Sequence, residues 1–336
     1  MKILVIGGTG FIGPYVVRDL IAAGHQVTLF HRNPYPEFER AAVQHILGNR
    51  SDLIAFKDEF IKLAPDVVLD MIPFSEDDSK AVVQTFRGIA GRIVAISSCD
   101  VYRAYGILRG TEGGPLQAVP LTESSAVRKN RFPYRNIDKN STYEKILVEE
   151  TMLNCPDLHG TILRLPMVYG PKDKQHRMYQ YLKRMQDRRP VIILEQGFSM
   201  WRWTRGYVED VAHAIILAVT DEQALGEIFN VGERNALDMK SWVGLIARSY
   251  GWNGDVLTLT EGRLPEELKP GINTAQHLET DTTKIRKVLG YEEQLPAEEA
   301  IRRTIEWELK NPPEKIDRVD YDYELEDKIL STKAVQ

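Results

Sequence analysis

Residues 1–32 read MKILVIGGTGFIGPYVVRDLIAAGHQVTLFHR, and this stretch decides the fold. Its first apolar run, Ile3–Ile6, has no polar interruption, which is typical of a strand buried on both faces of a parallel sheet. A helical pattern follows from about residue 11 to residue 23 and ends at Gly24. The second apolar run, Gln26–Phe30, completes a strand–helix–strand unit.

Three glycines at three-residue spacing, Gly7, Gly10 and Gly13, join this first strand to the helix. In such a turn the first glycine permits the sharp bend, the second lets the backbone approach a phosphate, and the third lets helix and strand pack closely. The helix N-terminus adds free N–H groups and the positive end of its dipole. The unit therefore predicts a site for the diphosphate of a dinucleotide, and a glycine turn without a ligand is the alternative.

Composition and charge exclude several classes of protein. The 336 residues are 43% hydrophobic and 27% charged, which is ordinary for a globular protein with a substantial core. A formal net charge of −5 argues against a general nucleic-acid binder. The two cysteines, Cys99 and Cys155, suit neither a disulfide framework nor a metal site, and no apolar run is long enough to span a membrane. We expect a cytoplasmic protein without a metal site or a membrane contact.

Strand and helix patterns keep alternating after the first unit. Further strands are expected at about 43–47, 67–72, 92–97 and 159–165, and further helices at about 53–63, 77–90 and 141–154. This alternation predicts an α/β fold with a Rossmann-type, doubly wound parallel sheet. Right-handed crossovers would place the strand C-termini, and the ligands, along one edge.

The later part of the chain has a looser pattern. Residues 102–140 are rich in glycine, proline and charge, and loops of that length are usually functional. We expect a dinucleotide-binding domain of residues 1–170, to which a strand and helix from about 205 to 232 return. A smaller α/β substrate domain would comprise 171–204 and 233–311. Residues 312–336 are predicted to be an acidic, solvated tail, with contacts only through Tyr321 and Tyr323.

Six motifs follow one another in a fixed order: GGTGFIG at 7–13, SSCDVY at 97–102, Lys145 with Glu149, RLPMVYGP at 164–171, RGYVEDV at 205–211 and FNVG at 229–232. In this set the chain resembles the extended short-chain dehydrogenase/reductase family, in its NAD-dependent epimerase/dehydratase group, over about residues 1–300. The resemblance implies an enzyme that acts on a sugar or nucleotide sugar as an epimerase, dehydratase or reductase. It also implies that the first motif binds the cofactor through Gly7, Thr9, Gly10, Phe11, Ile12 and Gly13.

The resemblance further implies a catalytic tyrosine, a lysine four residues later that lowers the pKa of the phenol, and a serine or threonine hydroxyl. Ser98 and Lys145 match this pattern, but Ser141 stands where the tyrosine is expected. Tyr143 is only two residues from Lys145, and residues two apart on a helix do not share a face.

Three interpretations of this departure stay open. Tyr143 is a structural ring, or it is the acid/base because the helix begins irregularly, or another group serves and Tyr143 is uninvolved. The other candidate groups are Tyr102, Tyr105, Tyr134, Asp100 and Ser141. The third interpretation includes the case in which no proton transfer occurs. The protein would then be a non-catalytic sensor or scaffold that binds the cofactor.

The end of the second strand bears on the choice of cofactor. NAD-preferring proteins usually carry an acidic residue there for the ribose hydroxyls, whereas this chain has His31 and Arg32. Arg32 can clamp a 2′-phosphate, or stack on the adenine and accept either cofactor. We expect NAD or NADP, with a slight preference for NADP. Asn49 and Arg50 stand where the family often has a Gly-Asp pair beside the adenine.

Basic residues gather at 128–139 and at 172–189, although much of 183–189 reads as a solvated helix face. Local positive charge of this kind can hold phosphate or carboxylate. The resemblance implies that Arg202 and Arg205 hold the diphosphate of a sugar-like substrate, and Tyr102 and Tyr134 are assigned to the same side. The basic segment 128–139 alone supports the alternative of an RNA-binding relative. A homodimer is possible from the resemblance.

Overall fold

The computed structural model describes residues 1–336 except 34, 36–37, 39–42, 136–140, 316–320 and 334–336. A seven-stranded sheet lies at its centre, with the strand order β10-β6-β5-β4-β1-β2-β3 and every neighbouring pair parallel. The strands are β1 (Lys2–Ile6), β2 (Gln26–His31), β3 (Gln44–Leu47), β4 (Val67–Asp70), β5 (Arg92–Ser98), β6 (His159–Leu165) and β10 (Ile228–Asn230). The predicted α/β fold with a doubly wound parallel sheet is confirmed. The strand order reverses between β1 and β4, which is where ligands bind in such sheets.

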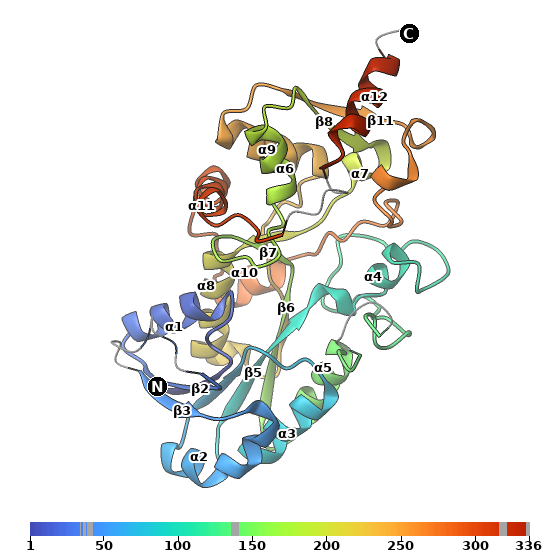
Figure 1. Cartoon of the computed structure of the whole chain (residues 1–336). Helices are drawn as coiled ribbons and strands as arrows, with labels where there is room; N and C mark the ends of the chain where they lie inside the picture. Colours follow the sequence, from blue (N-terminus) through green and yellow to red (C-terminus); the bar gives the residue numbers. More distant parts are fainter. Residues whose placement is uncertain (34, 36–37, 39–42, 136–140, 316–320, 334–336) are drawn as a thin grey trace.

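Helices cover both faces of the sheet (Figure 1). One face carries α1 (Gly13–Ala22) and α8 (Val208–Thr220), and the other carries α2 (Lys57–Leu63), α3 (Glu76–Phe86) and α5 (Lys145–Leu153). Successive residues of β1 alternate between the two cores: Ile3 and Val5 pack toward α1 and α8, Leu4 and Ile6 toward the other helices. This two-sided burial explains the unbroken apolar run, because each such side chain contributes about 1.5–3 kcal/mol when it leaves water.

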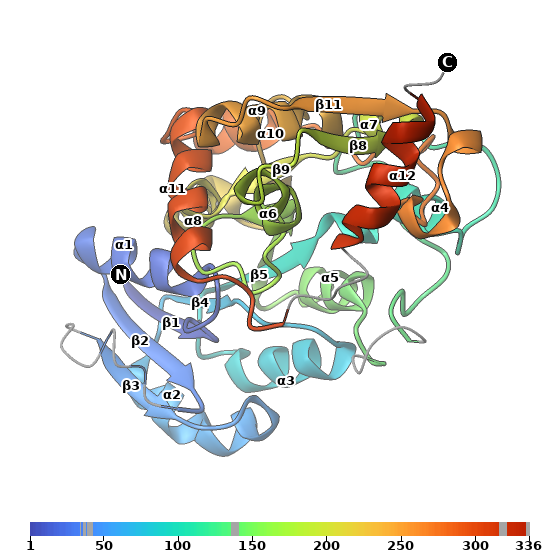
Figure 2. The ribbon, with the colours of Figure 1, turned by 45° about the horizontal axis from the view of Figure 1, so that its top comes forward.

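A second lobe lies over the carboxyl edge of the sheet (Figures 1 and 2). It contains two short parallel pairs, β7 with β9 and β8 with β11. Its elements are β7 (Met167–Tyr169), α6 (Tyr179–Gln186), β8 (Val191–Glu195), α7 (Gln196–Met200), β9 (Arg205–Tyr207), α9 (Met239–Tyr250), β11 (Asp255–Leu259) and α11 (Ala297–Lys310). The helix α10 (Thr283–Leu289) instead packs against β10 and α8 of the lower lobe. The second lobe therefore covers the edge of the sheet at which the strands end.

Several predicted elements differ from the observed ones. The strand expected to return to the sheet near Arg205 is β9, which pairs with β7 instead, and β10 is the later strand that joins the sheet. A 3-10 helix, Arg50–Phe56, precedes α2 where one continuous helix was expected. The segment predicted to be irregular contains α4 (Arg103–Leu108). The helix predicted from residue 141 begins only at Lys145, as the first residue of α5.

The described part of the tail is packed through Tyr323, as predicted, but it is held by more contacts than a solvated tail would have. Residues 323–333 form α12 (Tyr323–Lys333), and Glu326 on this helix is 3% exposed. Arg184 of α6 donates to Glu326 at 2.8 Å, and Tyr323 donates to Asp187 at 2.6 Å. The acidic side chains are thus partners of basic residues from 183–189, which accordingly do not form a purely solvated face. Residues 316–320 and 334–336 of the tail lie outside the described part of the chain.

None of the helices in the described part is long and apolar enough to cross a membrane. No group of three or more His, Cys, Asp or Glu side chains among the same residues is arranged to hold a metal ion.

Candidate functional site

The glycine turn has the geometry that a dinucleotide diphosphate requires. Gly7 has φ of +83°, and a Cβ added there would lie 2.6 Å from the Ile72 side chain. A Cβ on Gly13 would lie 2.4 Å from the carbonyl oxygen of Gly8, so only glycine allows α1 to pack this close to the turn. A Cβ on Gly10, in contrast, meets no atom within 4 Å. No side chain caps the N-cap residue Ile12, so the helix end remains available to an anion.

His31 at the end of β2 uses both of its ring nitrogens within the protein. Its Nδ1 lies 2.6 Å from the carbonyl oxygen of Asn33, and its Nε2 lies 2.8 Å from Nδ1 of His45 on β3. The carbonyl can only accept, so Nδ1 of His31 carries the proton and Nε2 accepts from His45. His31 therefore shapes this end of the cofactor groove, while the exposed Arg32 beside it is free to approach a ligand.

Arg50 does not lie open beside a cofactor, contrary to the expectation. Its guanidinium makes two 2.6 Å bonds to the fully buried carboxylate of Asp70, and its Nε donates to Asp78 at 2.8 Å. These bonds tie the end of β4 to the first turn of α3, so Arg50 is a structural residue. Asn49 uses its side chain to accept from the N–H of Ser51, as the N-cap of the following 3-10 helix.

Lys145 is buried at the start of α5 and is 3% exposed. Its ammonium donates to the carbonyl oxygens of Pro73 at 2.7 Å and Ile96 at 2.8 Å. Burial lowers the pKa of Lys145 to about 8, even though Asp100 and Asp70 act in the opposite direction. An ammonium has three donors, so one remains for a ligand.

Tyr143 lies beside Lys145, because it precedes the helix instead of belonging to it. Glu144 is extended (φ −158°, ψ 96°), and the ring of Tyr143 has its centre 5.7 Å from Nζ of Lys145. The rule that residues two apart point to different faces applies only within a helix. The hydroxyl of Tyr143 bonds that of Ser98 and donates to Asp100 at 2.8 Å.

Two more tyrosines extend this cluster. Tyr134 donates to Oδ2 of Asp100 at 3.2 Å and lies 2.8 Å from the hydroxyl of Tyr105 on α4. The structure thus brings together Ser98, Tyr143, Lys145 and Tyr134, which the sequence singled out, and Asp100, which it gave as one candidate among five. Burial is the main cause that raises the pKa of Asp100, and burial next to this carboxylate raises the pKa of Tyr143. Tyr143 is therefore a neutral phenol at ordinary pH.

A buried ion pair explains why the chain takes this path before α5. Arg128 is 2% exposed, its Nη2 bonds Glu144 at 3.0 Å, and its Nε donates to the carbonyl oxygen of Asp100 at 2.6 Å. The same carboxylate caps α5 by accepting from the N–H of Ile146 at 3.0 Å, and it accepts from the N–H of Phe132 at 2.6 Å. The helix therefore begins at Lys145, and Tyr143 is held over Asp100.

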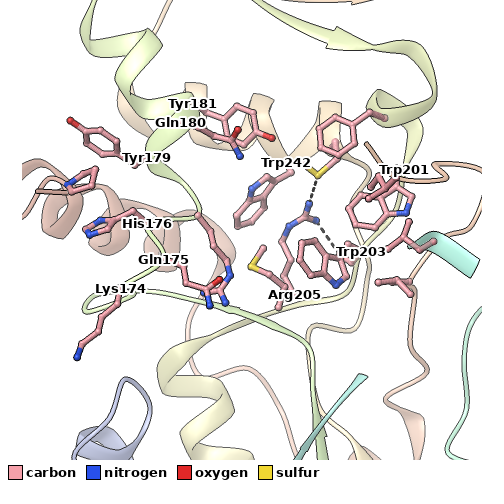
Figure 3. Close-up of a pocket in the computed structure, with 18 of the residues that line it drawn as sticks. Lys174, Gln175, His176, Tyr179, Gln180, Tyr181, Trp201, Trp203, Arg205 and Trp242 are labelled. Atoms are coloured by element: carbon pink, nitrogen blue, oxygen red, sulfur yellow. Dashed lines mark hydrogen bonds between the residues drawn. The ribbon is translucent and has the colours of Figure 1, made fainter. Parts of the chain in front are cut away.

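A cavity of about 650 Å³ lies next to this cluster, between the two lobes (Figure 3). Tyr105 lines it from the lower lobe, and Trp201, Trp203 and Trp242 line it from the upper one. Arg205 is 1% exposed and lies between Trp242 and Trp203, with the guanidinium 4.4 Å from the centre of a Trp242 ring. Burial lowers the pKa of Arg205 to about 10, which leaves it charged near neutrality.

The donors of Arg205 are only partly used by the protein. Nη1 donates to the carbonyl oxygens of Trp203 at 3.1 Å and Leu237 at 3.0 Å, and Nη2 contacts the sulfur of Met239 at 2.8 Å. Nε has no partner among the described residues. The edge formed by Nε and Nη2 can therefore hold two oxygens of one anion.

Two residues assigned to the substrate lie elsewhere. Tyr102 is completely buried, and its hydroxyl bonds Asn230 at 2.6 Å and Arg164 at 3.0 Å, so it belongs to the core. Arg202 is half exposed and lies 3.6 Å from Glu279, away from the cavity. The sequence motifs alone did not show that the side chains of Tyr102 and Arg202 point away from the cavity.

The basic segment also differs from the expectation. Arg128 is inside the site, and Arg131 pairs with Glu150 at 2.9 Å. Lys139 lies outside the described residues. Sequence reasoning missed the role of Glu144, and it missed Trp242, Pro313 and Lys315 in the lining of the cavity. It named Tyr321 as a contact residue of the tail but not as part of this lining. The one signal in the sequence was Arg128, the partner of Glu144, which is an arginine in a loop without periodicity.

Comparison with known proteins adds the family. The chloroplast stem-loop binding protein of 41 kDa b from Arabidopsis thaliana is 24% identical, over 99% of this chain and 85% of its own length. A probable dTDP-glucose 4,6-dehydratase from Sinorhizobium fredii is 25% identical, over 93% of each chain. The solved UDP-glucose 4-epimerase of Thermotoga maritima, with UDP-glucose, has a similar fold at 20% identity, with a TM-score of 0.67 over 92% of this chain and 99% of its own.

A family model covers the cofactor turn, the Ser98 and Lys145 motifs and the Arg205 motif together. It is that of the NAD dependent epimerase/dehydratase family, and it matches residues 3–232. This match spans more than half of the 336 residues. The protein belongs to the NAD dependent epimerase/dehydratase family.

Proposed function

We propose that the protein is an NAD(P)-dependent enzyme that converts a nucleotide sugar as an epimerase, dehydratase or reductase. The observation that carries this proposal is a convergence at the carboxyl edge of the sheet. Lys145, Ser98 and Tyr143 form one cluster, and Tyr134 and Tyr105 connect this cluster with a cavity that contains one buried, partly unpartnered arginine. The glycine turn follows β1 at the same edge of the sheet. Oxidation at a sugar carbon needs these parts: a dinucleotide, a proton-transfer group and a means of holding the substrate.

The cofactor would be held along the first strand–helix–strand unit. Residues 7–13 and the N-terminus of α1 would bind the diphosphate, and the third donor of Lys145 would reach the nicotinamide ribose. When bound, the nicotinamide supplies hydride acceptance and return. Ser98 would hold the reacting oxygen of the substrate, because its hydroxyl already bonds that of Tyr143.

Arg205 would hold the phosphate side of the substrate. The edge formed by Nε and Nη2 has the bidentate geometry of a phosphate or carboxylate, and a Trp242 ring packs against the guanidinium. Among the described residues no carboxylate bonds Arg205, and Glu233 compensates its charge only through space. A buried charge that is incompletely compensated is costly, which favours a role in binding an anion.

Turnover tests this function directly. The protein is incubated with NAD or NADP and with UDP-glucose or dTDP-glucose in deuterated water, and products are identified by NMR and mass spectrometry. We expect conversion by the wild type, loss of conversion in Lys145→Met, and wild-type conversion in Lys80→Met, an exposed lysine of α3. Cofactor binding without conversion of either sugar nucleotide would favour a sensor or scaffold instead.

The preference for NADP depends on Arg32. We propose that this exposed side chain contacts the 2′-phosphate, since no acidic residue ends β2. A charge-assisted hydrogen bond contributes about 1.5–3 kcal/mol, so Arg32→Ala should lose about ten- to hundredfold in NADP affinity and little in NAD affinity. Isothermal calorimetry with both cofactors measures this, with Arg87→Ala as the control. An equal loss of affinity for NADP and for NAD would contradict the proposed contact between Arg32 and the 2′-phosphate.

RNA is the competing ligand, because one relative is named for stem-loop binding. The basic segment 128–139 motivated that alternative, and two of its residues, Arg128 and Arg131, are paired with Glu144 and Glu150. We therefore propose a small-molecule substrate and no nucleic-acid function. A tight, salt-dependent affinity for a stem-loop RNA would contradict this. The homodimer and the cytoplasmic location stay predictions, which light scattering and cell fractionation test.

A further inference from the structure

Asp100 is a buried carboxyl group in the middle of the candidate site. It lies in the 3-10 turn Cys99–Val101 that follows β5 and is 4% exposed. Its Oδ2 accepts from Tyr143 at 2.8 Å and from Tyr134 at 3.2 Å, while Oδ1 has no partner among the described residues. A buried oxygen without a partner costs free energy, so its presence calls for an explanation.

Among the residues that the structure describes, no ion pair explains this carboxyl group. Arg128 bonds the backbone oxygen of Asp100, and its guanidinium is directed to Glu144. Lys145 acts on Asp100 through space, but its ammonium is bonded to two backbone carbonyls. The phenols Tyr105, Tyr134 and Tyr143 and the thiol of Cys99 also face the cluster, and Asp70, Asp78 and Arg50 act on it through Lys145. The contacts of the carboxylate itself are therefore phenols, which can exchange protons with it.

We propose that Asp100 is the proton acceptor of this site and that Tyr143 passes the proton between Asp100 and the substrate, in place of the tyrosine that is absent at Ser141. The assignment rests on the proposed function. Tyr143 is the group that touches the substrate, and Asp100 acts through it. This differs from a phenolate made reactive by a nearby lysine, because here the phenol stays neutral and the carboxylate takes the charge.

The step is a double proton transfer. The O–H bond of a substrate hydroxyl breaks, and its proton forms a new O–H bond on Tyr143. At the same time the original proton of Tyr143 moves to Oδ2 of Asp100, which becomes a carboxylic acid. The electron pair stays on the substrate oxygen, so the substrate gains the negative charge that Asp100 loses. In the reverse direction the same atoms return the proton to an oxygen of the substrate.

A line of hydroxyls connects Asp100 with the cavity. Tyr134 bonds Asp100, Tyr105 bonds Tyr134 at 2.8 Å, and Tyr105 lines the cavity. This line gives the proton on Asp100 a path to the cavity solvent after each transfer. Tyr134 thus has two functions in the proposal: it holds the carboxyl group in place, and it carries the proton onward.

Asp100→Asn tests the proposal, because it keeps the shape and removes the proton acceptor. With UDP-glucose and NAD as probes, we expect kcat to fall by about a hundredfold to ten-thousandfold with little change in KM. The wild-type kcat should rise with pH as Asp100 ionises, at a pH above that of an ordinary aspartate, and Asp100→Asn should lack this limb. Asp210→Asn, another buried acid, should keep both kcat and the pH profile. Wild-type kcat and profile in Asp100→Asn would overturn the proposal.

A second measurement needs neither cofactor nor substrate. The negative charge of Asp100 raises the pKa of Tyr143, so Asp100→Asn should move one phenol ionisation to lower pH by about one pH unit or more. Ultraviolet titration of Asp100→Asn against Asp100→Asn/Tyr143→Phe isolates this phenol among the 14 tyrosines. An unchanged phenol titration would overturn the coupling, whatever the substrate proves to be.

The two measurements separate the possible failures. If the wild type converts neither sugar nucleotide, the proposed function fails, and the phenol titration still decides whether Asp100 and Tyr143 are coupled. If Asp100→Asn does not fold, as judged by near-ultraviolet circular dichroism, Tyr143→Phe takes its place. That variant keeps the ring that packs on Phe74, and it should lose as much kcat as predicted for Asp100→Asn. Wild-type kcat in Tyr143→Phe would contradict the proposal.

Discussion

Lys145 places a positive charge where water cannot stabilise it, and two backbone carbonyls compensate for only part of that loss. Its pKa of about 8 means that the ammonium begins to lose its proton just above neutrality. Cofactor affinity should therefore fall as pH rises through about 8, because the neutral amine is a weaker donor to the ribose.

We expect Lys145→Met to bind NAD about ten- to hundredfold more weakly than the wild type at pH 7, which is the value of a charged hydrogen bond. Its affinity should also be constant between pH 7 and pH 9, unlike that of the wild type. Fluorescence titration with the reduced cofactor measures both effects. An identical pH dependence in the variant would assign the titration to another group.

Glu233 gives a stability prediction at the same scale. Its carboxyl group bonds Tyr169, and burial raises its pKa to about 7 from an ordinary value near 4.5. The folded protein therefore holds this proton more tightly than the unfolded chain. The stability that the group contributes is complete below about pH 4.5 and is lost as pH rises to about 7.

Glu233→Gln removes this loss and keeps an acceptor for Tyr169. Its free energy of unfolding relative to wild type should rise by about 2–3 kcal/mol between pH 4.5 and pH 7.5, at about 1.4 kcal/mol for each unit of pKa shift. Urea unfolding at several pH values measures the difference. Glu298→Gln on the surface of α11 should show no such trend, and a flat difference for Glu233→Gln would contradict the assignment.

At the scale of elements, the start of α5 determines the geometry of the site. Glu144 is an unusual N-cap residue, and it serves here because Arg128 holds its carboxylate in the core. Removal of one partner of a buried ion pair costs about 3–5 kcal/mol, since the other charge remains without compensation. Arg128→Met should destabilise the protein by this amount and displace Tyr143.

The double variant Arg128→Met/Glu144→Leu makes this prediction specific. Replacing both partners of a buried pair by apolar residues is often nearly neutral, so the double variant should recover most of the stability. It should not recover activity, because α5 then lacks its cap and Tyr143 its fixed position. A double-mutant cycle by chemical unfolding, with turnover measured alongside, tests both statements. Recovery of turnover in the double variant would show that the cap does not position Tyr143.

The pair Arg128 and Glu144 also shows which parts of the structure the sequence predicts and which it does not. The strands β1, β4 and β5 are predictable because burial on two faces demands unbroken apolar runs, and β6 matches its predicted range of 159–165. The glycine turn is predictable because only glycine fits the close contacts at positions 7 and 13. The start of α5 is not, because its cap depends on an arginine 16 residues away in a loop without periodicity. Asp100 could be named only as one candidate, since the loop that brings Tyr134 to it follows no repeating pattern.

At the scale of the whole molecule, the two lobes meet at the carboxyl edge of the sheet, and α12 lies on the upper lobe (Figure 2). The match to the family model ends at residue 232, so the tail lies outside the matched residues. Pro313, Lys315 and Tyr321 nevertheless line the cavity, and α12 is docked on the upper lobe. Its acidic side chains suggested solvation in the sequence because their partners, at 184 and 189, are more than 130 residues away.

Docking of α12 depends on a small set of charges. Glu326 lies 2.7 Å from Arg184 and 3.5 Å from Arg189, and Asp327 bonds Arg189 at the surface. The buried pair should dominate, because exposed ion pairs contribute about 0–1 kcal/mol and hydrogen bonds to charged groups about 1.5–3 kcal/mol. Glu326→Gln should therefore weaken docking by about 1–3 kcal/mol, and Asp327→Asn by less.

Loss of docking should be visible both in α12 and in the cavity. Hydrogen exchange of the α12 amides should accelerate about tenfold or more in Glu326→Gln, since local opening follows the docking free energy. In a background with Trp252→Phe and Trp307→Phe, the three remaining tryptophans all line the cavity. Quenching of their fluorescence by acrylamide therefore measures how well the tail shields the cavity from solvent. We expect stronger quenching in Glu326→Gln and no change in Glu324→Gln, whose side chain is exposed on the same helix. Equal quenching in Glu326→Gln and wild type would mean that the tail does not cover the cavity, and that Tyr321 and Lys315 lie at its margin only.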